Sequence, residues 1–159
     1  MRYQSTLFPL AVTSLLFVLP LAGSAQSIKP FVDSQHYVFQ PWTAQSLSGP
    51  LHHLSAADFT LEITRDKIVS DLPYYGRAYV APMDPTTNVL DFSSGKFTYT
   101  LTPRKKDGWI VLIKPEDNQD IQQLQLTIGS NGYSSLQVLF SNRDPIIFNG
   151  IVLAPEVRK

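Results

Sequence analysis

Short runs of alternating apolar and polar residues, separated by turn signals, constrain this chain more than any other feature. Residues 58–64 alternate phenylalanine, leucine and isoleucine with threonine and glutamate, and residues 96–102 and 121–128 repeat the pattern. Successive side chains of a β-strand point to opposite faces of the sheet. Each run therefore predicts a strand with one buried face and one face toward solvent.

The segments between these runs predict tight connections. Asn131-Gly132 suits the positive φ angles of a hairpin turn, and residues 103–108 form a charged hairpin tip. Residues 109–114 are apolar on both faces, which is typical of a strand covered on both sides. No segment after residue 25 carries a convincing helical pattern, and residues 75–80 are expected to form one more strand.

The sequence therefore predicts an all-β fold, an antiparallel meander of about eight to ten short strands. Two architectures remain open: a curled sheet or small barrel, and a two-sheet β-sandwich. We favour the curled sheet because the expected hairpins follow one another without long crossovers.

The first 25 residues have the three parts of a secretory signal peptide. Arg2 precedes an apolar run over residues 7–21, and small residues follow up to Ala25. A transmembrane anchor is the alternative, but the run holds two prolines and is shorter than the roughly 20 residues that a span needs. The predicted organisation is a signal peptide (1–25), a flexible leader (26–35), a single all-β domain (36–153) and a C-terminal tail (154–159).

Composition excludes several classes of protein. The chain has no cysteine, so it has no disulfides and no thiolate chemistry, and it lacks the residue on which a bacterial lipoprotein is anchored. Removal of Arg2 with the signal peptide leaves 12 of the 13 basic residues against 13 acidic ones, which argues against nucleic-acid binding. We therefore expect an exported protein, periplasmic or extracellular, with no transmembrane segment after signal cleavage.

The densest candidate site is the stretch 72–82, Leu-Pro-Tyr-Tyr-Gly-Arg-Ala-Tyr-Val-Ala-Pro. In an extended strand Tyr75, Arg77 and Tyr79 would share one face, with the guanidinium between two rings. This face is interpreted either as a recognition platform or as a packed strand whose polar groups bond to nearby carbonyls.

Several motifs resemble those of the DUF4251 family, uncharacterised exported proteins of Bacteroidetes. They are residues 72–79, Phe97-Thr98-Tyr99, residues 131–138, and Asn142-Arg143 before Pro145-Ile146. The resemblance extends over roughly residues 36–152 and implies an envelope or secreted location. It implies no activity, cofactor or catalytic residue, and this chain departs from the lipoprotein members because it lacks the cysteine.

Tyr133 and Arg143 join Tyr75, Arg77 and Tyr79 as candidate ligand-binding residues, although both also belong to predicted turns.

We expect no catalytic residue, metal or cofactor. The chain has only three histidines and no Gly-x-Ser-x-Gly elbow. The acidic loop 116–120 has oxygens for a weakly bound calcium ion, but an acidic turn is the commoner explanation. Residues 104–106 form a basic tip, either a solvated turn or a contact for anionic lipid or polysaccharide.

These observations favour a non-enzymatic exported binding domain of the bacterial envelope. Its ligand would be a protein, a glycan or a small amphiphile. The alternative is a structural or assembly factor that acts through edge strands. A minor alternative is a hydrolase with an unrecognised site. The sequence leaves the ligand and the oligomeric state open.

Overall fold

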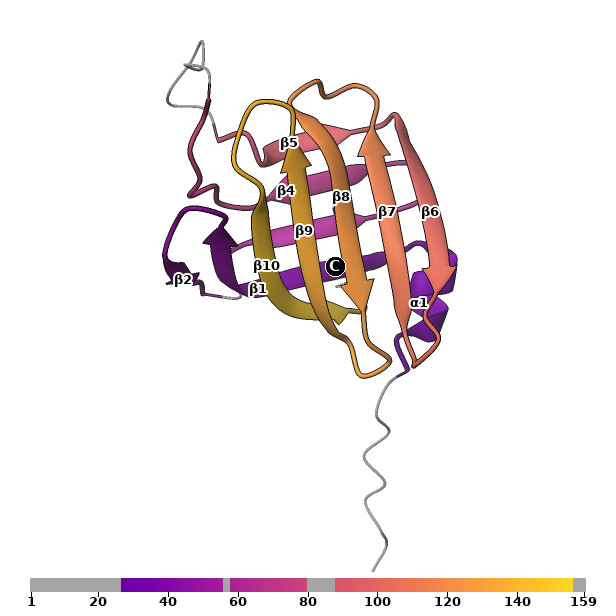
Figure 1. Ribbon diagram of the computed structural model, residues 1–159. Coiled ribbons are helices and arrows are strands. Elements are labelled where there is room, and N and C mark those ends of the chain that lie inside the picture. Colours follow the sequence, from indigo (N-terminus) through magenta and orange to yellow (C-terminus); the bar gives the residue numbers. More distant parts are fainter. Residues whose placement is uncertain (1–26, 56–57, 80–87, 156–159) are drawn as a thin grey trace, which may run out of the picture.

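One short helix and ten strands make up the part of the chain that the computed structural model describes, residues 27–55, 58–79 and 88–155 (Figure 1). In chain order they are α1 (Lys29–Ser34), β1 (Tyr37–Ser46), β2 (Leu51–His53), β3 (Thr60–Ile63), β4 (Ile68–Asp71), β5 (Asp91–Ser94), β6 (Phe97–Pro103), β7 (Trp109–Pro115), β8 (Ile121–Ile128), β9 (Tyr133–Phe140) and β10 (Ile146–Leu153).

All ten strands belong to one antiparallel sheet. Its order is β5-β4-β3-β1-β10-β9-β8-β7-β6, and β2 is paired with β1 beside this path. Figure 1 shows β6 to β9 lying across β1, β3, β4 and β5, so the sheet curls until it nearly closes like a barrel. The predicted all-β fold and its curled form are confirmed, because the two layers are one continuous hydrogen-bonded sheet.

The fold passes from one layer to the other where β1 meets β10. The register shifts between Pro41 and Thr43, which marks a bulge in β1. Opposite the bulge, a Cβ atom on Gly150 would lie 2.1 Å from the carbonyl oxygen of Gln40 and 2.7 Å from the Cα of Pro41. Only glycine permits this approach of two backbones, so Gly150 lets the sheet bend here.

The core fills the space between the two layers. Its largest fully buried side chains come from most of the strands, for example Phe39 from β1, Leu61 from β3, Leu126 from β8 and Phe148 from β10. Burial of each such side chain stabilises the fold by roughly 1.5–3 kcal/mol.

The outer face of β7 is less buried than the sequence predicts. Val111 and Ile113 on the inner face are buried as expected, whereas Ile110 and Leu112 on the outer face are only half-buried. No second layer of the described residues covers that face. The cross-strand neighbours of Ile110 and Leu112 are Thr102, Thr127, Thr100 and Gln125, so the apolar run does not indicate a second layer here.

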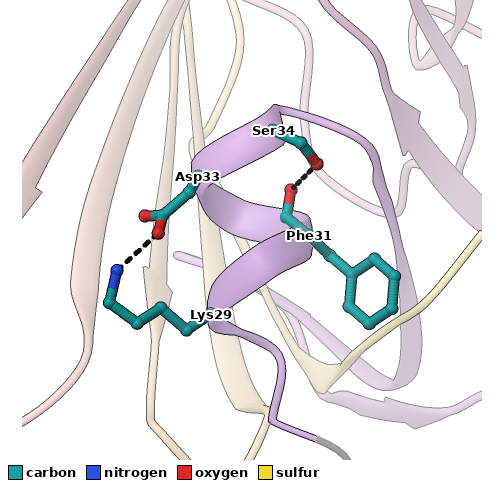
Figure 2. A network of polar contacts seen from close by, with 4 residues as sticks. All are labelled: Lys29, Phe31, Asp33 and Ser34. Carbon is teal, nitrogen blue, oxygen red and sulfur yellow. Dashed lines mark hydrogen bonds and ion pairs between the residues drawn. The ribbon is translucent and has the colours of Figure 1, made fainter.

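Within the predicted flexible leader, Lys29–Ser34 form the helix α1. Pro30 suits the first turn of a helix, and Gln35 ends it with a left-handed φ of 54°. Figure 2 shows an ion pair between Lys29 and Asp33, and the Ser34 hydroxyl donating to the carbonyl oxygen of Phe31 at 3.1 Å. Val32 is fully buried, so the helix forms where tertiary packing supports a sequence with little helical pattern.

The predicted signal peptide, residues 1–25, and residues 156–159 of the predicted tail lie outside the described residues. The helix α1 is too short to cross a membrane, and it is the only helix in the described ranges.

Candidate functional site

Residues 72–79 form an irregular segment, here called the strap, in place of the predicted strand. Its one ladder contact is an isolated antiparallel bridge between Ala78 and Arg143. The Tyr79 amide donates to the carbonyl oxygen of Asn142 at 2.8 Å, and the Asp144 amide donates to that of Arg77 at 2.9 Å. The strand prediction was wrong because the strap pairs with the turn between β9 and β10. A turn offers no continuous ladder for a strand to join.

The carboxylate of Asp144 is the centre of the hydrogen bonds that hold the strap. It accepts a hydrogen bond from the Tyr79 hydroxyl at 2.6 Å, one from the Arg77 amide at 3.4 Å and one from the Ser48 hydroxyl. Asp144 is only 5% exposed. The hydroxyls of Ser48 and Tyr79 hold the pKa of Asp144 below its usual range, so it is ionised at neutral pH. We call Asp144 and these three donors the latch.

Tyr74 is the least exposed of the three strap tyrosines and packs against the sheet. Its hydroxyl lies 2.9 Å from the carbonyl oxygen of Asp144 and 3.1 Å from that of Arg77, and donates to both. Its ring meets the ring of Phe140 edge-on, with centroids 5.0 Å apart. Burial, followed by the charge of Asp144, raises the pKa of Tyr74 to about 12. Tyr74 therefore joins the strap both to the turn and to β9.

A second contact joins the strap to the hairpin of β1 and β2. The ring of Tyr75 stacks on His52 of β2, with centroids 3.9 Å apart and an angle of 13° between the planes. The Ser46 hydroxyl, at the end of β1, donates to the carbonyl oxygen of Tyr75 at 3.5 Å. The strap thus bridges two connections that lie far apart in the sequence.

Four of the five candidate ligand-binding residues lie at this end of the sheet. Tyr75, Arg77 and Tyr79 are exposed strap residues, and Arg143 is half-buried beneath them. The predicted stack of the Arg77 guanidinium between the rings of Tyr75 and Tyr79 does not form among the described residues. Instead the guanidinium carbon of Arg143 lies 5.8 Å from the ring centroid of Tyr74.

Tyr133 lies elsewhere. It begins β9, opposite Ile151 of β10, and its ring meets Trp42 edge-on with centroids 5.7 Å apart. It is 60% exposed. The site prediction for Tyr133 remains untested, but this residue does not share a surface with the strap.

Sequence reasoning missed the residues that position the strap, namely Asp144, Ser48 and His52. Asp144 lies in the turn that the sequence predicts around Arg143, but no role was predicted for it. In the structure Asn142 Oδ1 and Arg143 Nε are buried without a hydrogen-bond partner among the described residues, and Asp144 makes the capping contacts. An aspartate before proline is a usable signal of such a turn, but its partners lie far away in the chain.

Five exposed apolar side chains belong to the strap or to the segments next to it. Of the seven large hydrophobic residues that are exposed in the described ranges, two belong to the strap, Tyr75 (39%) and Tyr79 (65%), and three belong to neighbouring segments, Leu47 (76%), Leu51 (49%) and Ile147 (43%). The register places Leu51 and Ile147 on either side of Gln45. Beside them is a pocket of about 270 Å³, lined by Gln45, Ser46, Leu47, Gln137, Pro145 and Ile147. We call these exposed side chains and the pocket the anchor surface.

In the acidic loop 116–120, groups of the protein itself donate hydrogen bonds to Asp117. The carboxylate of Asp117 accepts hydrogen bonds from the Ser94 hydroxyl at 2.5 Å and from the amides of Gly95 and Lys96 at 3.1 and 3.3 Å. These bonds, chiefly that from Ser94, lower the pKa of Asp117. Within residues 27–55, 58–79 and 88–155, no three metal-ligating side chains come close enough to form a metal site.

The fold and the strap define a small all-β domain built on one nearly closed antiparallel sheet. The chain belongs to the DUF4251 family, a domain of unknown function, whose profile matches residues 22–152. This confirms the resemblance seen in the sequence motifs.

A solved structure of this family is similar in fold. The crystal structure of a DUF4251 family protein from Bacteroides eggerthii DSM 20697 superposes with a TM-score of 0.58 at 9% identity, covering 82% of this chain and 87% of that chain. At such low identity the likeness shows the fold alone. No protein with a curated function matches the chain.

Proposed function

We propose that this protein is an exported, non-enzymatic binding domain that recognises a protein partner through the anchor surface. The observation that carries the proposal is that five of the seven exposed large hydrophobic residues of the described ranges lie in the strap or in neighbouring segments, and that two of them, Leu47 and Ile147, line a pocket. Single exposed apolar side chains are ordinary on a protein surface, but a contiguous group beside a hollow is typical of an interaction site.

The pocket suits a side chain better than a free small molecule. Its volume of about 270 Å³ lies below the roughly 300–1,000 Å³ of most small-molecule sites. Leu47, Pro145 and Ile147 provide apolar contacts, while the amides of Gln45 and Gln137 provide neutral hydrogen-bonding groups. An apolar anchor of a partner protein, surrounded by weaker contacts that exclude water, fits this arrangement.

The latch supports the proposal because it orders the strap before a partner binds. Asp144 holds Tyr79 and the Arg77 amide, and Tyr74 joins the strap to the turn. A surface that is already ordered loses less conformational entropy on binding. The signal-peptide pattern of residues 1–25 supports export. The mass of the protein recovered from the producing cells tests this, because cleavage after Ala25 removes the first 25 residues.

The binding experiment starts from a photoreactive residue at position 47, cross-linked in envelopes of the source organism. The captured protein is purified, and its affinity for the wild type, L47D and L153D is measured by calorimetry. Leu47 is 76% exposed and Leu153 38%, and Leu153 lies at the other end of β10 as a matched control. We expect L47D to weaken binding by about 1–3 kcal/mol and L153D to leave it unchanged. Equal affinities for all three proteins would contradict the proposal.

A further inference from the structure

Strand β6 is a terminal strand of the sheet. Among the described residues β7 is the only strand that pairs with it, over seven residues from Phe97 to Pro103. The other terminal strand, β5, is only four residues long. In Figure 1 β6 lies on the side of the molecule opposite β2, so it is separate from the anchor surface.

The register shows which backbone groups of β6 point away from β7. The Glu116 amide donates to the carbonyl oxygen of Lys96 at 2.8 Å, and the Arg104 amide donates to that of Gly108 at 3.0 Å. In an antiparallel pair every second residue bonds to the partner strand. The residues of β6 that bond to β7 are therefore Thr98, Thr100 and Thr102.

The intervening residues Phe97, Tyr99 and Leu101 consequently present their amide and carbonyl groups at the open edge. None of the three takes part in a backbone hydrogen bond outside the ladders of the described residues. Three donors and three acceptors at two-residue spacing match the backbone of an extended peptide.

The side chains of β6 are less buried than those of β7, and α1 lies beside one end of the strand (Figure 1). Phe97, Tyr99 and Leu101 pack against the core but are only half-buried, whereas Val111 and Ile113 on the inner face of β7 are fully buried. The outer residues Thr98, Thr100 and Thr102 are exposed. Charge, proline and bulges are the usual means of protecting an edge strand. In β6 these features lie at the ends, at Lys96, Pro103 and Arg104, whereas residues 97–102 carry no charge, no proline and no register shift.

Charge at the two ends of β6 favours an acidic partner over a second copy of the chain. Lys96 precedes the strand, Arg104, Lys105 and Lys106 follow it, and Lys114 lies opposite Thr98. The acidic neighbours are Asp107, Glu116, Asp117 and Asp33 of α1, whose charge acts on Tyr99, so the basic residues still outnumber the acidic ones. Antiparallel pairing of two β6 strands about Thr100 would bring Lys96 of one copy next to Arg104 of the other. Like charges in this position oppose self-association.

We propose that β6 is a docking edge for an extended acidic segment of a partner protein, which adds to the sheet as a further strand. The open groups of Phe97, Tyr99 and Leu101 bond to its backbone. Its acidic side chains lie near Lys96 and residues 104–106. A different surface carries this inference, so it does not depend on the anchor surface.

Amide hydrogen exchange followed by NMR tests the edge directly. In the free protein we expect fast exchange for the amides of Phe97, Tyr99 and Leu101 and protection for those of Thr98, Thr100 and Thr102. The probe is a synthetic peptide that alternates valine and glutamate, and its binding should protect the first three amides. A peptide that alternates valine and lysine is the control, and we expect it to bind at least about tenfold more weakly.

Three results would overturn the proposal. They are protection of all six amides in the free monomer, protection that rises with protein concentration alone, and an acidic peptide that protects none of the three edge amides. The first would mean that the edge is already covered, and the second that it pairs with another copy.

A pair of variants separates backbone pairing from burial. Leu101→Pro removes one outward amide, and Leu101→Val keeps that amide with a similar loss of apolar volume. We expect the acidic peptide to bind at least about tenfold more weakly to L101P and nearly normally to L101V. Equal affinities for both variants would contradict strand addition. If L101P fails to fold, the exchange experiment on the wild type tests strand addition instead.

Discussion

Asp144 and Asp117 show the same chemical device used for two purposes. Each aspartate lies in a turn between strands, accepts a hydrogen bond from a serine hydroxyl and at least one from a backbone amide, and has a lowered pKa as a result. Asp117 holds the corner between β5 and β6, at Gly95 and Lys96. Asp144 holds the strap.

The two aspartates differ in burial and in the distance over which they act. Asp117 is exposed, whereas Asp144 is 5% exposed and also binds the hydroxyl of Tyr79. The donors to Asp117 lie 21 to 23 residues away in the sequence, and those to Asp144 lie 65 to 96 residues away. Asp117 therefore closes a local corner, whereas Asp144 brings together three distant connections and orders a surface for binding.

The largest difference should follow from removing each charge. We expect Asp144→Asn to lower Tm by roughly 5–10 °C and Asp117→Asn by roughly 2–4 °C, because Asp144 is itself buried and joins the strap to two other connections, whereas Asp117 is exposed and closes one local corner. Thermal unfolding followed by circular dichroism measures both. Limited proteolysis should cut the strap of D144N and leave that of D117N intact. Equal Tm losses, with equal resistance to cleavage, would remove the distinction between the two sites.

Lowering the pH should reveal the same difference between Asp144 and Asp117. A lowered pKa in the folded state stabilises the protein above the unfolded value of about 3.9, and this stability is lost as pH falls through the folded value. Both aspartates contribute, so wild-type stability should fall steeply below about pH 4. Urea unfolding from pH 2 to pH 6 should give a shallower fall for D144N than for the wild type. An unchanged slope in D144N would show that Asp144 is not held in its ionised form by the latch.

Alkaline pH should affect the strap through Tyr74. Its pKa is raised to about 12, so the neutral phenol stabilises the fold. That stability is complete below about pH 10 and is lost as pH rises through the folded value. Tyr74→Phe should cost about 1 kcal/mol at neutral pH, for the lost hydrogen bond, and should reduce the loss between pH 10 and pH 12. Denaturant unfolding over this range measures it, and an identical alkaline loss in Y74F would be evidence against this role.

The smallest effect is expected for the stack of Tyr75 on His52. The rings are partly exposed, so a double-mutant cycle with Tyr75→Ala and His52→Ala should give a coupling energy of about 0.5–1.5 kcal/mol. Chemical unfolding of the wild type, the single variants and the double variant supplies the four values. A coupling energy near zero would mean that the latch alone positions the strap.

Much of the fold was open to prediction from local pattern. The alternation in residues 58–64, 96–102 and 121–128 and the Asn131-Gly132 turn correspond to strands and a hairpin in the structure. The strand predicted over the strap failed because tyrosine-rich sequences suit a strand and an ordered loop equally well. Helix α1 was missed because its one fully buried side chain, Val32, leaves almost no periodic signal.

By itself the sequence determined the class of fold, the family and the absence of disulfides, since alternation, motifs and composition are properties of neighbouring residues or of simple counts. The candidate site was decided by tertiary structure. Ser48, Arg77, Tyr79 and Asp144 meet only after β1, the strap and the turn before β10 have been brought together by the curled sheet. A hydrogen bond between residues 96 positions apart depends on the path of the whole chain, and no local pattern records that path.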